Sequence, residues 1–202
     1  MLLVHGGAAR EGESAVSPTQ LSVLRMIPLA HRISRTSRGR LTVVRLLNST
    51  RGWDTSHTPA MDVRWALGEL ENRYGALPVA LVGHSLGGRA TLLAGDAEGV
   101  RSVVALNPWL HAHDTNDLGG RRVLIVHGTE DRVASITQAR TVADRLARTT
   151  RLAFLEVPGG KHAMLRHGRL FESYAAEFVT ATLLGEGEVR LSPAVAAVLN
   201  AG

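Results

Sequence analysis

Short runs of Val, Leu and Ile alternate with longer segments of helical character along most of this sequence, and that alternation restricts the fold more than any other feature. The runs are apolar at successive positions, which is typical of strands buried on both faces of a parallel sheet. The pattern predicts an α/β protein with a doubly wound, mostly parallel six-stranded sheet and helices on both faces. The predicted strands are residues 2–4, 41–47, 79–82, 102–106, 123–126 and 152–157, and the predicted helices are residues 18–36, 59–74, 86–95, 135–149 and 170–184.

A length of 202 residues fits one domain over residues 1–202, and a hydrophobic content of 45% is enough for a sizeable core. The tail from about residue 185 receives no assignment. Because the chain contains no cysteine, disulfides, thiolate metal sites and cysteine nucleophiles are excluded. No signal peptide and no apolar stretch of membrane-spanning length is visible, so we expect a cytoplasmic protein without a membrane partner.

The formal net charge of +5 raises the question of a nucleic-acid partner. The arginines are scattered, however, and the densest group, between Arg32 and Arg40, lies at the end of a predicted helix without interleaved aromatic residues. This arrangement is typical of a solvated helix end, so we expect no nucleic-acid partner. The sequence does not indicate the oligomeric state.

The most informative motif is Gly83-His84-Ser85-Leu86-Gly87, between a predicted strand and a predicted helix. A sharp strand-to-helix turn needs glycine where a Cβ would clash, and it exposes the serine hydroxyl at the end of the sheet. A Gly-Ser turn without a catalytic role is the alternative. The strand–turn–helix context favours Ser85 as a nucleophile.

A serine hydroxyl needs a base to react at neutral pH. His162 follows the last predicted strand on a glycine-rich loop, and Asp131 follows the strand before it. We expect His162 to be the base and Asp131 to orient it, with Glu130 as the rival acid and a surface histidine as the alternative for His162. Ligands bind outside the carboxyl ends of strands in such sheets, and all three predicted residues follow strands.

The segment His5-Gly6-Gly7-Ala8 follows the first predicted strand. Glycine there lets backbone N–H groups approach a reacting carbonyl. We expect the N–H groups of Gly7 and Leu86 to form an oxyanion hole, with Ala8 as the alternative to Gly7. His5 is interpreted as structural.

Weaker signals concern substrate contacts. Trp53 and Trp109 follow strands and either contact substrate or cover the sheet end, and His84 is interpreted as packing more than reacting. The His- and Asp-containing loop at 111–117 has metal-binding residue types but no supporting cluster elsewhere, so we expect a polar surface loop and no metal.

The motifs Val4-His5-Gly6-Gly7, Gly83-His84-Ser85-Leu86-Gly87-Gly88, His127-Gly128-Thr129-Glu130-Asp131-Arg132-Val133 and Gly160-Lys161-His162 resemble the α/β-hydrolase superfamily over nearly the whole chain. The resemblance is to its small, uncapped, bacterial dienelactone-hydrolase-like and esterase-like members, here with a serine nucleophile. The order Ser85, Asp131, His162 is the order of that superfamily.

The resemblance implies a serine hydrolase that cleaves a short-acyl, small-molecule ester through an acyl-enzyme, without a cofactor. One alternative is a thioesterase or acyltransferase that acts on a carrier-bound acyl group. The other is a non-catalytic binding protein with the same fold, because fold alone does not determine function.

Overall fold

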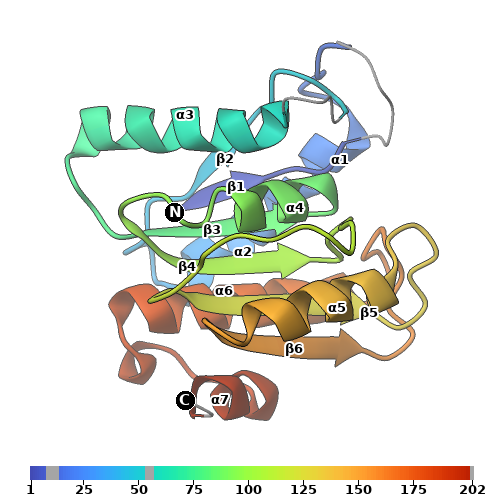
Figure 1. The fold of residues 1–202 in the computed structure, drawn as a ribbon. Helices are drawn as coiled ribbons and strands as arrows, with labels where there is room; N and C mark the ends of the chain where they lie inside the picture. The colour runs from blue at the N-terminus through green and yellow to red at the C-terminus, as the bar shows by residue number, and fades with distance from the viewer. Residues whose placement is uncertain (8–13, 53–56, 201–202) are drawn as a thin grey trace.

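The computed structural model describes residues 1–7, 14–52 and 57–200, and its strands form a single sheet (Figure 1). The strand order is β2-β1-β3-β4-β5-β6, and every neighbouring pair is parallel. The predicted α/β fold with a six-stranded sheet is therefore confirmed, and the described sheet is parallel throughout. The strands are β1 (Leu2–Val4), β2 (Val44–Leu46), β3 (Val79–His84), β4 (Val100–Leu106), β5 (Arg122–Gly128) and β6 (Arg151–Val157).

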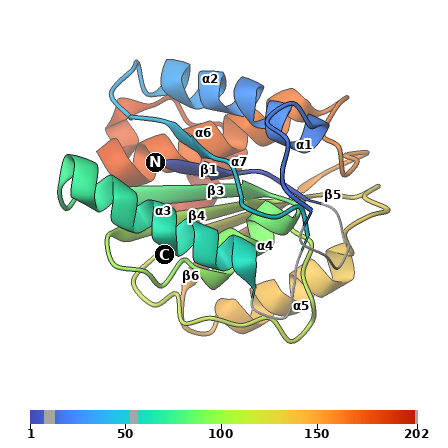
Figure 2. The same cartoon turned by 90° about the horizontal axis from the view of Figure 1, so that it is seen from above.

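The helices form a layer on each face of the sheet (Figure 2). Helices α2, α6 and α7 cover one face, and α3, α4 and α5 cover the other. Such an arrangement follows from right-handed crossovers between parallel strands, which place a helix over the sheet after each strand. The helices are α1 (Leu21–Leu24), α2 (Met26–Thr36), α3 (Thr58–Tyr74), α4 (Leu86–Leu93), α5 (Ile136–Leu146), α6 (Gly168–Leu184) and α7 (Pro193–Asn200), with a short 3₁₀ helix at Glu186–Glu188.

The core consists of two clusters that the sheet separates. Successive strand residues point to opposite faces, so Leu3 and Val82 join the cluster under α2 and α6, whereas Leu2 and Leu81 join the cluster under α3, α4 and α5. All four side chains are at most 1% exposed. Burial on both faces explains why the strands are recognisable as continuous apolar runs in the sequence.

One predicted helix is divided in two. The sequence suggests a single helix over residues 18–36, whereas α1 ends at Leu24 and α2 begins at Met26. Pro28 explains the break, since its ring clashes with the carbonyl four residues earlier, which is that of Leu24. As a result Arg25 stands at the junction of the two helices.

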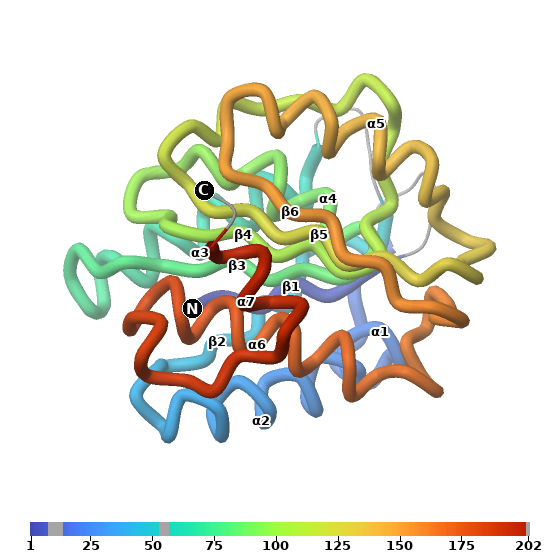
Figure 3. Tube along the Cα trace, turned by 90° about the horizontal axis from the view of Figure 1, so that it is seen from below, coloured from blue at the N-terminus to red at the C-terminus, as the bar shows by residue number. Residues whose placement is uncertain are grey.

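One further expectation needs correction, and the tail can now be described. The predicted strand at 41–47 is only Val44–Leu46, because its partner β1 offers three positions for pairing. The tail, which the sequence left unassigned, forms the 3₁₀ helix and α7, and α7 lies against α6 and β6 (Figure 3). Val195 and Leu199 are the buried residues that attach α7 to the body. No helix in the described ranges is long and apolar enough to cross a membrane.

Candidate active site

Ser85 stands at the turn between β3 and α4 in a strained backbone conformation. Its φ is 57° and its ψ is −121°, and its side chain is buried. A non-glycine residue rarely has a positive φ, and such strain often marks functional sites. Close backbone contacts impose this turn, since a Cβ at Gly83 would overlap the carbonyl of Gly87, and one at Gly87 would overlap the carbonyl of Val4. The N–H of Ser85 donates to the carbonyl of Leu106 at 3.0 Å, which ties the turn to β4.

The three residues predicted to act together lie in one hydrogen-bonded chain. The distance from Ser85 Oγ to His162 Nε2 is 2.9 Å, and that from His162 Nδ1 to Asp131 Oδ2 is 2.8 Å. A carboxylate can only accept, so Nδ1 carries the hydrogen and Nε2 presents a lone pair to the hydroxyl of Ser85. This tautomer is the one that a base acting on Ser85 requires.

The side chain of Asp131, on the loop after β5, is fully buried. Its Oδ1 accepts from the N–H groups of Val133 at 2.8 Å and Ala134 at 2.9 Å, which leaves Oδ2 for His162. Burial acts to raise the pKa of Asp131, but the hydrogen bonds from His162 and from the two N–H groups outweigh it, so the pKa lies below its usual value. Asp131 is therefore ionised at neutral pH. Glu130, the rival acid, has an exposed side chain.

A second imidazole, that of His127, is buried beside Asp131 and was not assigned a role from the sequence. Its Nε2 lies 3.2 Å from the carbonyl oxygen of Ala134 and 3.6 Å from Asp131 Oδ2. Burial lowers the pKa of His127, so the ring is neutral and its Nε2–H donates to the carbonyl of Ala134. His127 thus holds the loop that carries Asp131.

The loop after β1 lies directly against the nucleophile, since a Cβ at Gly6 would be 3.1 Å from Ser85 Cβ. His5 Nε2 accepts from the N–H of Asn48 at 3.1 Å, so its Nδ1–H donates to the carbonyl of Gly6 at 2.6 Å. Across a trans peptide the next N–H points the opposite way, so His5 fixes the direction of the Gly7 N–H. This agrees with the structural role expected for His5.

Leu86, the other expected oxyanion donor, is the first residue of α4, so its N–H has no carbonyl four residues earlier in the helix. The N–H of a helix start also carries a partial positive charge. The oxyanion roles of Gly7 and Leu86 remain predictions, and Ala8 lies outside the described residues.

Two of the expected substrate contacts can be placed. Trp109 is partly exposed, and its backbone N–H donates to the carbonyl of Ser85 at 3.1 Å, which ties its backbone to the turn that carries the nucleophile. The ring stands edge-on to that of His111, at 4.7 Å between centroids. His84, in contrast, is buried, and its Nε2 lies 2.8 Å from the carbonyl oxygen of His162. Trp53 lies outside the described residues.

The loop at 111–117 is less superficial than expected, because Asp114 is buried. Its two carboxylate oxygens accept from Nε and a terminal nitrogen of Arg89, both at 2.7 Å. Arg89 is on α4, so the pair attaches this loop, and with it Trp109, to the helix that begins beside Ser85. Within the described ranges no three His, Asp or Glu side chains gather as a metal site would require.

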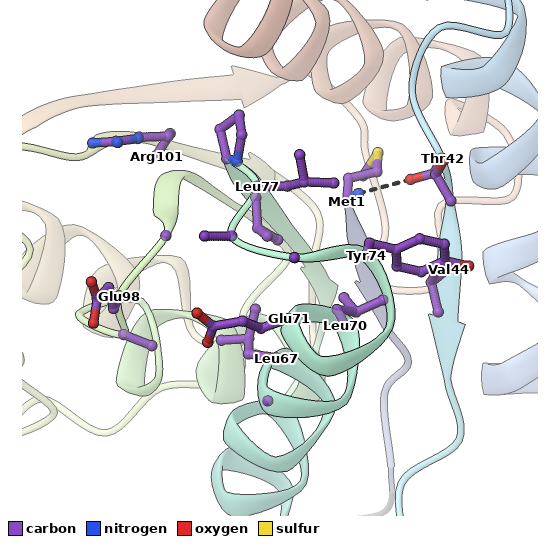
Figure 4. Close-up of a pocket in the computed structure, with 17 residues that line it drawn as sticks. Met1, Thr42, Val44, Leu67, Leu70, Glu71, Tyr74, Leu77, Glu98 and Arg101 are labelled. Carbon is purple, nitrogen blue, oxygen red and sulfur yellow. Dashed lines mark hydrogen bonds between the residues drawn. The ribbon is translucent and has the colours of Figure 1, made fainter.

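A cavity of about 410 Å³ lies elsewhere, at the amino ends of the strands (Figure 4). Its lining includes Met1 before β1 and Val79 at the start of β3, whereas Gly7 and Ser85 follow the same two strands. Leu67 and Leu77 form part of its apolar wall. The cavity and the Ser85–His162–Asp131 chain are therefore at opposite edges of the sheet.

Comparison with solved structures finds many chains with a similar fold. An α/β serine hydrolase without a lid from Xanthomonas campestris has a TM-score of 0.65 and 16% identity, covering 95% of this chain and 83% of that chain. Est1E from Butyrivibrio proteoclasticus has a TM-score of 0.64 and 13% identity, with coverages of 90% and 86%. An alpha-beta serine hydrolase homologue from Coxiella burnetii has a TM-score of 0.63 and 17% identity, with coverages of 90% and 83%. No protein-family model and no curated protein sequence matches. Identities this low show a shared fold and nothing finer.

Proposed function

Because the chain has the α/β-hydrolase fold, we propose that it is a serine hydrolase that cleaves small carboxylic esters through an acyl-enzyme on Ser85. The observation that carries this proposal is the hydrogen-bonded chain from Ser85 through His162 to Asp131, at 2.9 and 2.8 Å. The three residues come from three separate loops and are bonded in the order that activates a serine. His162 has the tautomer that lets it take the proton of Ser85. The strained φ of 57° at Ser85 adds independent support.

In the first half of the reaction, His162 Nε2 takes the hydroxyl proton as Ser85 Oγ attacks the ester carbonyl. The carbonyl oxygen becomes an oxyanion, which the N–H groups of Gly7 and Leu86 stabilise. The ionised Asp131 stabilises the imidazolium ion. His162 then gives the proton to the leaving alkoxide, the C–O bond breaks, and an acyl-enzyme and a free alcohol result.

In the second half, a water molecule takes the place of the alcohol. His162 Nε2 removes one proton from the water as its oxygen attacks the acyl carbon, and the oxyanion forms again at the same N–H groups. The tetrahedral intermediate collapses, Ser85 Oγ leaves with the proton from His162, and the carboxylic acid is released. No step calls for a metal ion or a cofactor.

A short acyl group suits this site best. The segment between β4 and β5 is a loop, held by Arg89 and Asp114, and not a helical cap. Trp109 on that loop is tied to Ser85 through its backbone N–H, and its partly exposed indole offers an aromatic surface for a small substituent. An uncapped site cannot enclose a long chain, and enclosure is what gives apolar ligands most of their binding energy.

The test is the intact mass of the protein after incubation with a fluorophosphonate, which reacts with activated serines. We expect one adduct on the wild type, none on Ser85→Ala, and a normal adduct on Ser17→Ala, whose serine is exposed and remote from the motif. Absence of an adduct on folded wild-type protein would contradict the proposal and favour a non-catalytic binding protein.

A second measurement separates an esterase from a thioesterase. The values of kcat/KM are compared for an oxyester and a thioester of the same short acyl group. We expect the oxyester to be the better substrate, while a strong preference for the thioester would assign the acyl-enzyme to thioester chemistry.

A further inference from the structure

The backbone carbonyl oxygen of His162 accepts hydrogen bonds from two buried side chains. His84 Nε2 lies 2.8 Å from it, and Asn107 Nδ2 lies 3.2 Å from it. His84 comes from the end of β3 and Asn107 follows the end of β4. The base is therefore held by groups on two strands other than the one that leads to its own loop.

Asn107 uses its remaining polar atoms on the neighbouring loops. Its Nδ2 also lies 3.2 Å from the carbonyl oxygen of Lys161, and its Oδ1 accepts from the N–H of Gly128 at 2.8 Å. Gly128 begins the turn that leads to Asp131. A single amide thus joins the segment that carries the acid to the segment that carries the base.

The backbone at Asn107 shows that this arrangement has a cost. Its φ is 42°, in the left-handed region, where asparagine is tolerated better than most residues, and its side chain is completely buried. The backbone N–H still donates to the carbonyl of Val126 at 2.8 Å. A buried, fully hydrogen-bonded amide in a strained conformation indicates that its position is determined by what it holds.

The location of His162 explains why its backbone needs these hydrogen bonds. It stands between β6 and α6 in a stretch without helix or strand, where regular hydrogen bonding does not fix the backbone. The place that the ring can reach depends on the position of the His162 Cα. Hydrogen bonds to the backbone carbonyl of the same residue restrict that position. His84 suits the task because burial, and then the charge of His162, lower its pKa to about 3, so it remains a neutral donor while the neighbouring ring gains and loses a proton.

We propose that His84 and Asn107 are positioning residues that hold the backbone of His162, so that its Nε2 stays within reach of Ser85 Oγ. The proposal rests on the proposed function for its kinetic consequence. Its structural consequence, a fixed His162–Asp131 hydrogen bond, does not depend on turnover.

The variants are chosen to separate this role from simple stability. His84→Leu removes the donor, whereas His84→Gln keeps an N–H at similar reach. Asn107→Gly removes the amide and also relieves the positive φ, so backbone strain cannot be the cause of any loss. The matched control is Ser102→Ala. Ser102 is buried in β4, as Asn107 is buried after it, but it lies away from the carboxyl end of the strand, and the substitution removes its hydrogen bond to Thr182.

The readouts are kcat and KM for a short-acyl ester, the rate of adduct formation by a fluorophosphonate, and the NMR signal of the His162 Nδ1 proton. We expect His84→Leu and Asn107→Gly to lower kcat and the adduct rate about 10- to 100-fold with KM nearly unchanged, because small displacements of a base cost this much. The Nδ1 resonance should shift or broaden in both. His84→Gln should recover most of the loss, and Ser102→Ala should keep wild-type kcat.

Wild-type kcat and an unshifted Nδ1 resonance in both His84→Leu and Asn107→Gly would overturn the proposal. If Asn107→Gly does not fold, the pair His84→Leu and His84→Gln decides alone. Absence of an adduct on the wild type would instead overturn the proposed function, and the Nδ1 resonance of the variants would still decide whether the two side chains position His162.

Discussion

The two edges of the sheet differ in what they bury. At the carboxyl edge the buried groups are polar and meet at His162: Ser85 and Asp131 hydrogen-bond to its ring, and Asn107 donates to its backbone carbonyl. At the amino edge lies a cavity of about 410 Å³, with apolar walls and with charged groups such as Glu71 exposed at the rim (Figure 4). Volume alone therefore does not identify the reactive site, because chemistry needs side chains in fixed mutual geometry.

Backbone strain follows the same division. Five described residues other than glycine have a positive φ, and four of them, His57, Ser85, Asn107 and Met164, follow strands at the carboxyl edge. Arg38, after α2, is the one at the other end. Strained residues persist only where the surroundings fix them, so their concentration at one edge marks the part of the molecule that is held for a purpose other than stability.

The largest expected difference between the edges is in catalysis. Asp131→Asn preserves the shape of the side chain but can donate to His162 Nδ1, which would favour the wrong tautomer, and we expect kcat to fall about 10⁴-fold. Glu71→Gln at the amino edge should leave kcat within twofold. Both values come from steady-state kinetics on a short-acyl ester, and comparable effects of the two substitutions would refute the division of labour between the edges.

Much of this molecule could be predicted from local sequence. The strands appear as apolar runs because both faces of the sheet are buried, and Ser85 stands out because the glycines on either side of it are required by contacts within the same turn. Asp131 and His162 could be proposed because each follows a strand, and the carboxyl ends of parallel strands share one edge.

What could not be predicted depends on contacts between distant segments. Asn107 reaches the carbonyl of a residue 55 positions away, and His84 reaches the same carbonyl across 78 positions. Nothing near either residue in the sequence indicates this shared acceptor. The division of the first helix at Arg25 is different in kind, because Pro28 indicates it within the local sequence.

Next in size is the effect of the ion pairs on stability. Asp114→Asn removes the charge that faces Arg89 at the carboxyl edge, where both side chains are at most 6% exposed. We expect a loss of about 3–5 kcal/mol in the free energy of unfolding, because a buried charge loses its counterpart. Asp96→Asn removes the partner of Arg64 next to the amino-edge cavity, where the side chains are 45% and 37% exposed, and should cost about 1 kcal/mol or less.

Urea denaturation of the two variants and the wild type at neutral pH provides these values. Equal losses would show that the carboxyl edge does not depend on buried charge more than the amino edge does.

The loss of unfolding free energy at acid pH that His84 causes at the carboxyl edge should be smaller than the loss in Asp114→Asn, but measurable. The pKa of His84 is about 3 in the folded protein against an ordinary value of 6.5, so the unfolded chain binds the proton first as the pH falls. Stability from this residue is complete above pH 6.5 and is lost toward pH 3, by about 2 kcal/mol at pH 5. Urea midpoints at pH 7 and pH 5 should therefore differ less in His84→Gln than in the wild type, whereas the exposed His31→Gln should behave as the wild type does. An unchanged difference in His84→Gln would contradict a buried neutral imidazole at this position.

The smallest effect is expected at the amino edge, where a substitution can improve stability without touching the chemistry. Gly68 is exposed in the interior of α3 and lines the cavity, and a Cβ added there would meet no atom within 4 Å. Since glycine is less favourable than alanine inside a helix, Gly68→Ala should stabilise the protein by about 0.5–1 kcal/mol and raise Tm by roughly 1–4 °C. Turnover should stay at the wild-type value, because the residue lies at the opposite edge from Ser85. A gain in Tm accompanied by a change in kcat would mean that the two edges are coupled through α3, and the separation between a strained reactive edge and a relaxed structural edge would then have to be abandoned.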